Sequence, residues 1–237
     1  MRRKEMLHEQ QRPGPVAHYH GKGREADEML KAVRDLYARG LELHWLYPKT
    51  KKPIGEGWST HPKRSLEDLK QSYESGYNLN LGVRTGRWST PEEGKALIII
   101  DMDVKSTDPH HALESQAAVE DLLGDASLYP CVASGRGNGS AHYYVAAEIE
   151  QLPSNTVYRV SPEAVMVMIG GEGKQRPAWQ VEILSTGKQA VVPPSIHPDT
   201  GEAYRWIVPI RTYAAIRTRS NAGNGICERL RMRCRLN

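Results

Sequence analysis

Two aspartates separated by one residue, Asp101 and Asp103, directly follow the apolar run of residues 97–100. Side chains of a β-strand alternate between its two faces, so a strand through this segment places both carboxylates side by side on one face. The apolar residues before them occupy both faces, as in a central strand of a covered sheet. Two neighbouring carboxylates repel each other, and a divalent cation with oxygen ligands is the simplest group to offset that repulsion. Asp-x-Asp also commonly opens a turn after a strand, so the motif alone leaves both interpretations open.

A glycine-rich segment, residues 134–140, separates two strand-like segments. Glycine allows positive φ angles and close backbone approach, and successive amide N–H groups can bind an anion. Arg136 adds a planar cation suited to phosphate, and His142, where the second strand begins, could donate to a phosphate oxygen. The segment is neither a Walker A loop nor a dinucleotide fingerprint, so an ordinary hairpin is the alternative.

A third carboxylate, Glu182, lies in the strand-like segment 178–184. A neighbouring strand could bring it to the two aspartates and so complete a site for two metal ions. A single Glu in a strand is also common on a solvated face.

Residues 191–201 combine paired prolines with an Asp-Thr-Gly turn. Proline stiffens the backbone and Asp-Thr-Gly is typical of a turn, so this segment is a rigid loop. Such a loop could hold Ser195 and His197 against a ligand, or it could be a simple tight hairpin.

Taken in order, these segments resemble the N-terminal catalytic domain of the bifunctional DNA primase/polymerases (Prim-Pol), a branch of the archaeo-eukaryotic primase superfamily. A Lys-x-Pro pattern followed by Gly-Trp in residues 48–58 begins the resemblance. Residues 78–86 are similar to the strand and Thr-Gly turn that precede the acidic motif. The resemblance covers residues 26–206.

The resemblance implies catalytic, metal-binding roles for Asp101, Asp103 and Glu182, with Glu182 at a position that is commonly Asp in the family. It also implies two metal ions, Mg²⁺ or Mn²⁺, as cofactors. His142 matches a residue of the family's active site.

The resemblance further implies a site for the triphosphate of an incoming nucleotide. Its implied nucleotide-binding residues are Ser134, Gly135, Arg136, His142, Lys188, Ser195 and His197.

The implied activity is template-directed nucleotidyl transfer, as a DNA primase, a DNA polymerase or both, in replication of DNA, with a mobile element as one candidate replicon. The implied partners are a single-stranded DNA template and primer and a dNTP or NTP, with a helicase as a further candidate and no membrane. Two alternatives use the same residues differently. One is a metal-dependent nuclease or phosphodiesterase, and the other is a non-catalytic module that binds single-stranded nucleic acid.

The chain of 237 residues has a net charge of only +4, so charge alone does not indicate nucleic-acid binding. Basic residues nevertheless gather in the first two dozen positions, in residues 49–52 and in 211–235, which would form either a cationic path for a template strand or solvated tails. The 3 cysteines fit neither a metal site nor an even disulfide set, and no apolar leader or membrane-length run is present. We therefore expect a cytoplasmic protein.

Apolar periodicity and capping signals predict the elements that must position these residues. Helices are expected over 25–39, from the capping box at Ser65 to about Gly76, and over 109–124 with Leu113, Val119, Leu122 and Leu123 facing inward. Strands are expected over 41–47, 78–86, 97–103, 129–133, 142–147, 165–169, 178–184, 189–192 and 204–208.

This order predicts an α+β fold: an archaeo-eukaryotic primase-like core whose mixed β-sheet has an RRM-like part and flanking helices. We expect a disordered basic tail over 1–24, the Prim-Pol catalytic domain over 25–210 and a basic linker or tail over 211–237.

Overall fold

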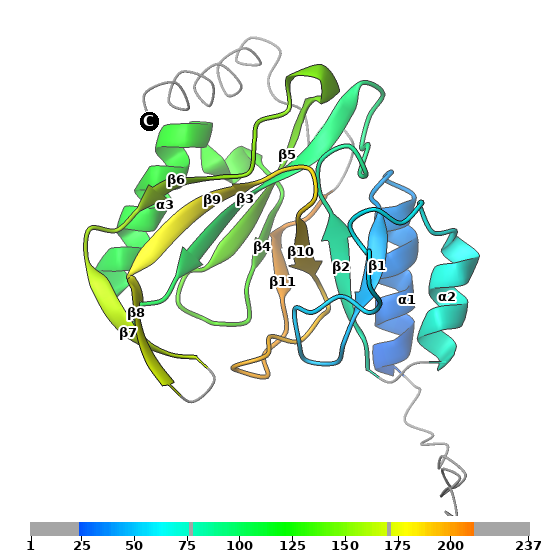
Figure 1. Cartoon of the computed structure of the whole chain (residues 1–237), viewed down its shortest axis with the longest axis horizontal. Coiled ribbons are helices and arrows are strands. Elements are labelled where there is room, and N and C mark those ends of the chain that lie inside the picture. Colours follow the sequence, from blue (N-terminus) through cyan, green and yellow to red (C-terminus); the bar gives the residue numbers. More distant parts are fainter. Residues whose placement is uncertain (1–23, 76–77, 170–171, 211–237) are drawn as a thin grey trace, which may run out of the picture.

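The computed structural model describes residues 24–75, 78–169 and 172–210 (Figure 1). The helices are α1 (Arg24–Tyr37), α2 (Leu66–Ser75) and α3 (Pro109–Leu123), with short 3-10 turns η1 (Ala126–Leu128) and η2 (Ile149–Gln151). The strands are β1 (Leu43–Leu46), β2 (Asn80–Arg84), β3 (Lys95–Val104), β4 (Cys131–Ala133), β5 (Ala141–Glu148), β6 (Thr156–Val160), β7 (Ala164–Ile169), β8 (Glu172–Pro177), β9 (Trp179–Leu184), β10 (Gln189–Val192) and β11 (Arg205–Val208). The predicted α+β class is confirmed.

The strands form three sheets. A six-stranded sheet has the order β11-β4-β5-β3-β9-β6, a three-stranded sheet the order β1-β2-β10, and β7 and β8 form a separate hairpin. The prediction of a mixed sheet is wrong for the described residues, because their paired strands all run antiparallel. Apolar periodicity carries no information on strand direction, which depends on how the connections return the chain.

Strand β3 lies in the middle of the six-stranded sheet and is covered on both faces, as predicted. Leu97 and Ile99 belong to a core that also contains residues of α1, α2 and the three-stranded sheet. Ile98 and Ile100 belong to a second core, against α3. The alternating apolar residues of one strand therefore join the two halves of the domain (Figure 1).

The helix ends follow their local sequence. Ser65 and Asp68 form the predicted capping box, in which the backbone N–H of Asp68 donates to the Ser65 hydroxyl at 3.0 Å and the Ser65 N–H donates to the Asp68 carboxylate at 3.2 Å. Asp108 caps α3 by accepting from the His110 N–H, and Pro109 occupies the first turn.

One helix face is predicted incorrectly. Leu113 of α3 is 70% exposed, whereas Val119, Leu122 and Leu123 are buried as expected. In the first half of α3 the inward positions belong instead to His111 and Ser115, which are both buried. Polar residues at inward positions weaken the apolar periodicity from which the face is read.

Two strands were not expected from the sequence. These are β6, at the edge of the six-stranded sheet, and β8, the second strand of the β7–β8 hairpin. In β8 every residue from Glu172 to Arg176 is exposed, so it lacks the apolar alternation that marks a half-buried strand.

Residues 1–23 and 211–237, which make up nearly all of the predicted tails, lie outside the described residues, and so do Cys227 and Cys234. Cys131 is a free, buried cysteine of β4. In the part of the chain that the structure describes, no helix is long and apolar enough to cross a membrane.

Candidate active site

Three of the predicted site residues form one row across the middle of the six-stranded sheet. Asp101 on β3 lies opposite Glu182 on β9 and opposite His142 on β5. Residues that lie opposite each other on antiparallel strands share a face, with Cβ atoms about 4.5–5.5 Å apart. The Nε2 atom of His142 is 3.4 Å from Oδ1 of Asp101. The row continues the sheet face that carries Leu97 and Ile99, at the carboxyl end of β3.

Asp103 lies two residues further along the same face, opposite Gln180. Its carboxylate forms an ion pair of 2.8 Å with the ammonium of Lys105. The structure thus brings the three acids together on one face, as predicted. In their present side-chain conformations, however, the described residues contain no group of at least three His, Cys, Asp or Glu side chains that could hold a metal ion.

The three carboxyl groups differ in acidity. Burial, followed by the neighbouring charge of Asp103, raises the pKa of Asp101 to about 6. Burial and then the charge of Asp101 raise the pKa of Glu182 as well. Burial also acts upward on the pKa of Asp103, but the hydrogen bond and charge of Lys105 outweigh it and hold that pKa below its usual value. The nearby lysines therefore compensate the negative charge of Asp103 but only part of that of Asp101 and Glu182.

His142 is a neutral residue at physiological pH. Burial, followed by the positive charge of Lys51, lowers the pKa of its ring to about 4. The ring centroid of Tyr204 lies 5.9 Å away, and that of His197 lies 5.7 Å beyond Tyr204. The Tyr204 hydroxyl is buried without a hydrogen-bond partner among the described residues. The three rings form one side of the site.

The glycine-rich loop connects β4 to β5, as predicted, and packs against the loop of residues 193–204. A Cβ atom on Gly135 would lie 2.3 Å from the carbonyl oxygen of Glu202, so only glycine fits there without a shift of the backbone. The hydroxyl of Thr200 donates to the carbonyl of Gly135 at 2.8 Å. The Ser134 hydroxyl accepts from the N–H of Arg136 at 3.3 Å. The two predicted phosphate-binding segments are therefore one packed unit.

Arg136 reaches across this unit. Its guanidinium forms an ion pair of 3.0 Å with Asp199, and its charge also lowers the pKa of Asp103. Arg136 is thus close to the acids but shared with a carboxylate of the neighbouring loop.

Ser195 is fully buried and bonded to the backbone of β2. Its hydroxyl accepts from the N–H of Leu81 at 2.8 Å and lies 3.3 Å from the Leu81 carbonyl. The hydroxyl therefore anchors the loop, and its predicted contact with a nucleotide stays a prediction.

His197 is also buried, and its Nδ1 accepts from the N–H of Asp199 at 3.2 Å. Burial, followed by the charges of Lys51 and Arg136, lowers its pKa. Lys188 lies in the turn between β9 and β10, and its charge acts on Glu182, lowering that pKa. The nucleotide-binding role predicted for both residues likewise stays a prediction.

Sequence reasoning placed Lys51 only in the basic segment 49–52, a candidate path for a template strand, and assigned no role to Lys105 or Tyr204. Lys51 acts electrostatically on Asp101, His142 and His197, although even the nearest of them in sequence, Asp101, lies fifty residues away. The available signal was the Lys-x-Pro pattern at residues 51–53, which carried the resemblance without a function attached. Lys105 and Tyr204 had no comparable signal.

One sheet face of this antiparallel α+β domain carries three acids and a neutral histidine, and the charges of nearby Lys and Arg residues act on them. Such an arrangement is suited to binding and transferring phosphate groups. The chain belongs to the Prim-Pol family, described as bifunctional DNA primase/polymerase, N-terminal, whose family model matches residues 33–216 of 237. The family implies DNA primase or polymerase nucleotidyl transfer in general. Comparison with curated proteins gave no match.

Proposed function

We propose that the chain carries out template-directed nucleotidyl transfer, as a DNA primase, a DNA polymerase or both, and that Asp101, Asp103 and Glu182 hold two Mg²⁺ or Mn²⁺ ions. The observation that carries the proposal is the row of Glu182, Asp101 and His142 across β9, β3 and β5. Membership of the Prim-Pol family supports the reaction class and a primase-like core.

The donor set fits such ions. All three candidate ligands are carboxylates, and hard oxygen ligands favour Mg²⁺ and Mn²⁺ over metals that prefer sulfur or imidazole. Burial, followed by like charge, raises the pKa values of Asp101 and Glu182, and a bound cation would offset the like charge. Asp103 would have to exchange its ion pair with Lys105 for a metal, and the carboxylates would have to turn toward one another.

When bound, such ions supply positive charge to the attacking and leaving oxygens of the transfer. The protein's own side chains supply position and charge. The neutral ring of His142 carries one N–H, which can donate to a phosphate oxygen beside Asp101. The charge of Arg136 acts on Asp103 and that of Lys188 on Glu182, and both cations suit the remaining phosphate charge.

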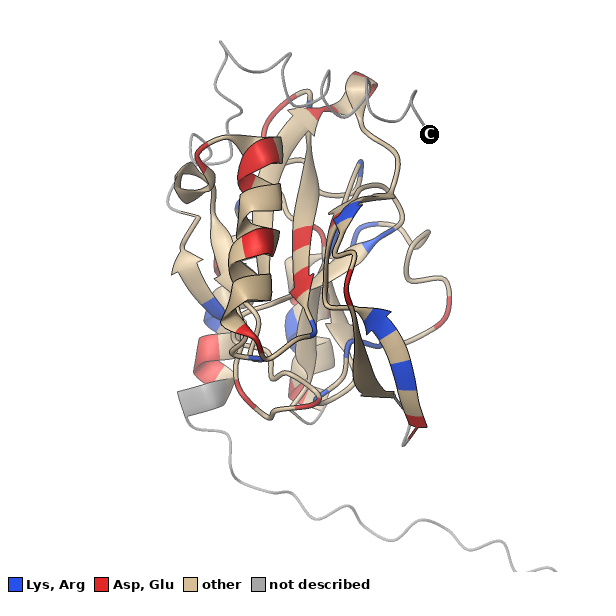
Figure 2. Ribbon diagram, turned by 90° about the vertical axis from the view of Figure 1, so that its left-hand side faces the viewer, with Lys and Arg blue, Asp and Glu red and all other residues tan. Residues whose placement is uncertain are grey.

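Surface charge favours one region of the domain for the DNA template and primer. Helix α3 carries the acids Glu114, Glu120 and Asp121, whereas β8 carries Lys174 and Arg176 beside one acid, Glu172 (Figure 2). The phosphate backbone of DNA is attracted to Lys and Arg and repelled by carboxylates. We therefore propose that the nucleic acid passes the β7–β8 hairpin and avoids α3.

A template-directed assay tests the proposal. Labelled dNTP or NTP is supplied with Mg²⁺ or Mn²⁺, with and without a primer. Incorporation that depends on template and metal supports the proposal, and the no-primer arm separates priming from extension. Loss of DNA without added nucleotide would indicate a nuclease instead. DNA binding without incorporation under any of these conditions would indicate a non-catalytic module.

A further inference from the structure

The segment that carries Lys51 is a closed turn between β1 and residue 54. The N–H of Tyr47 donates to the carbonyl of Lys52 at 3.0 Å, and Leu46 and Pro53 form a β-bridge. Thr50 closes the turn from inside, since its N–H donates to the Tyr47 carbonyl at 3.1 Å. The turn therefore has a fixed backbone, and Lys51 directly follows its Tyr47–Thr50 hydrogen bond.

Two side chains of the three-stranded sheet donate hydrogen bonds to the backbone of this turn. The amide nitrogen of Gln189 donates to the carbonyl of Lys51 at 2.8 Å. The amide nitrogen of Asn80 donates to the carbonyl of Thr50 at 3.0 Å and to that of Ile196 at 2.7 Å. The oxygen of the same Asn80 amide accepts from the Ile196 N–H at 2.9 Å. Asn80 thus joins the Lys51 turn to the loop that carries Ser195 and His197.

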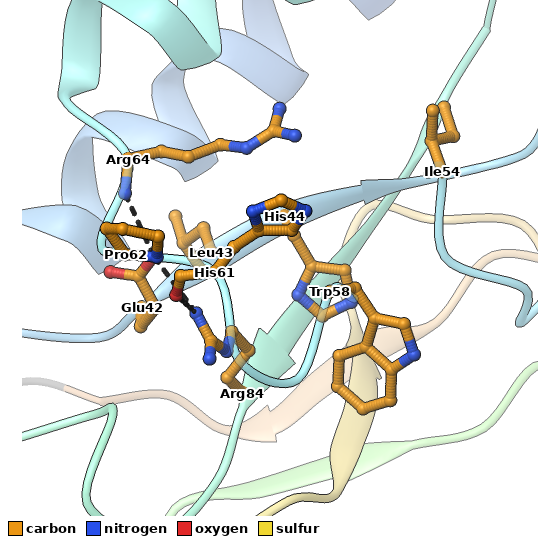
Figure 3. A pocket seen from close by; sticks show the side chains of 9 residues that line it. All are labelled: Glu42, Leu43, His44, Ile54, Trp58, His61, Pro62, Arg64 and Arg84. Carbon is orange, nitrogen blue, oxygen red and sulfur yellow. Dashed lines mark hydrogen bonds and ion pairs between the residues drawn. The ribbon is translucent and has the colours of Figure 1, made fainter. Parts of the chain in front are cut away.

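The chain beyond the turn is anchored as well, in the polar pocket of Figure 3. The buried guanidinium of Arg84 donates to the carbonyls of His61 and Ser59, each at 2.7 Å. Trp58 stacks on His44 with 5.2 Å between ring centroids (Figure 3). The whole segment from Tyr47 to His61 is therefore fixed on the sheet at both ends.

The cations near the acids differ in their partners. Lys105 is paired with Asp103 and Arg136 with Asp199. Lys51 is exposed and forms no ion pair with a described residue, yet its charge lowers the pKa of Asp101, His142 and His197. Together with the Asn80 bonds to Thr50 and Ile196, this charge effect places Lys51 near the carboxylate row, and its ammonium has no ion-pair partner among the described residues.

We propose that Lys51 binds the triphosphate of the nucleotide substrate, and that Asn80 is the positioning residue that sets the turn at the right distance from the acids. The inference rests on the proposed function for the identity of the substrate. A compact ammonium on a fixed turn is suited to a phosphate group that carries several negative charges. The β7–β8 hairpin, rather than Lys51, is the surface assigned to the DNA backbone.

The test compares Lys51→Ala with Lys52→Ala, a neighbouring lysine whose ammonium lies over the ring of Tyr47, 5.7 Å from its centroid. We expect Lys51→Ala to raise the KM for dATP about tenfold or more, as for loss of a charged hydrogen bond. The Kd for primed template should stay within about twofold, and Lys52→Ala should change neither value. Lys51→Arg should recover part of the loss.

Equilibrium binding of dATP, measured by calorimetry with Mg²⁺ and no DNA, gives a readout that does not need catalysis. Weaker dATP binding by Lys51→Ala supports the inference even if incorporation is absent. Unchanged dATP binding and KM would overturn it while the proposed transfer activity stands. If the Lys51→Ala variant loses affinity for primed template but not for dATP, Lys51 is a DNA contact and the inference is wrong. A wild-type chain that neither incorporates nor binds dATP would refute both proposals.

A double-mutant cycle tests the role of Asn80. Asn80→Ala should raise the KM for dATP in the wild-type background but add little to Lys51→Ala, because the two residues act through one contact. Additive effects would assign Asn80 a separate, structural role. Thermal unfolding of each variant identifies loss of the fold. Where Asn80→Ala does not fold, Asn80→Asp takes its place, since it keeps the acceptor oxygen for the Ile196 N–H and loses the bonds donated to the Thr50 and Ile196 carbonyls.

Discussion

Glu182 of β9 lies directly opposite Asp101 of β3, on the sheet face that continues from the core residues Leu97 and Ile99. The charge of Asp101 raises the pKa of Glu182, so the two carboxyl groups interact across the strand boundary. Two acids just over eighty residues apart in sequence are thereby fixed relative to each other by the register of one antiparallel pair. The proposed function depends on this pairing.

Replacing Asp101 with Asn should abolish nucleotide incorporation and leave the fold intact. The substitution removes one candidate metal ligand at nearly constant volume, and it also removes a buried charge with a raised pKa. We therefore expect a melting temperature at pH 7.5 equal to or above that of the wild type. Primer extension and thermal unfolding measure the two effects.

The matched control is Glu67→Gln, on the exposed side of α2, where the carboxylate forms only a surface ion pair with Lys70. Both activity and melting temperature should stay at wild-type values in this variant. Normal primer extension by Asp101→Asn would show that the metal assignment is wrong.

Binding of Mn²⁺ should weaken as the pH falls through about 6, where Asp101 takes up a proton. Because a metal ligand must be deprotonated, each pH unit below that value costs up to about tenfold in affinity. Calorimetry at pH 5 and pH 7.5 measures the change. An affinity independent of pH over this range would contradict the role of Asp101.

The free energy of unfolding should fall as the pH is lowered from about 6.5 toward 4, in part because of His44. Burial lowers the pKa of His44 from 6.5 to about 4, so in this window the unfolded chain binds the proton that the folded chain excludes. Between pH 7.5 and 5 this residue alone accounts for about 2 kcal/mol. Urea unfolding at the two pH values measures the loss.

His44→Gln provides the comparison, because an amide can still meet Gln189, whose oxygen lies 3.0 Å from Nε2 of His44. The variant should show a smaller loss of stability at pH 5 than the wild type. Some loss should remain, since the pKa of His142 is also lowered to about 4. An identical loss in variant and wild type would exclude His44 as a source.

Replacing Gly135 with Ala should destabilise the protein by roughly 1–3 kcal/mol and reduce nucleotide incorporation. The added Cβ would lie 2.3 Å from the carbonyl oxygen of Glu202, which is backbone and cannot move alone. Gly173→Ala is the control, because its nearest atom is the terminal methyl of Met166 at 2.9 Å, which can rotate away. Equal stability of the two variants would show that the close approach at Gly135 is not required.

Much of the fold could be predicted because local signals and burial agree. The capping box at Ser65, the proline at the start of α3 and the two-faced apolar run of β3 each gave the correct element. Leu113 was assigned to the wrong side because polar residues fill the inward positions of that turn. The exposed strand β8 has no apolar alternation to detect, and strand direction and order depend on contacts between distant segments.

The residues of the candidate site could be predicted from the sequence, but their relative positions could not. Asp101 and Asp103 share a face by periodicity alone, whereas the position of Glu182 depends on the register between β3 and β9. The burial of Ser195 against Leu81 could not be read from its loop, which is rich in turn-forming residues. Lys51 lies near the acids because its turn is held on the three-stranded sheet, and no local sequence pattern contains this long-range relationship.

The side-chain amide of Asn80 bonds both to Thr50, in the Lys51 turn, and to Ile196, in the loop of Ser195 and His197. A single amide thus couples the two loops mechanically. We expect their backbone amides to share one opening free energy in hydrogen-exchange experiments, so that a substitution that loosens one loop also loosens the other.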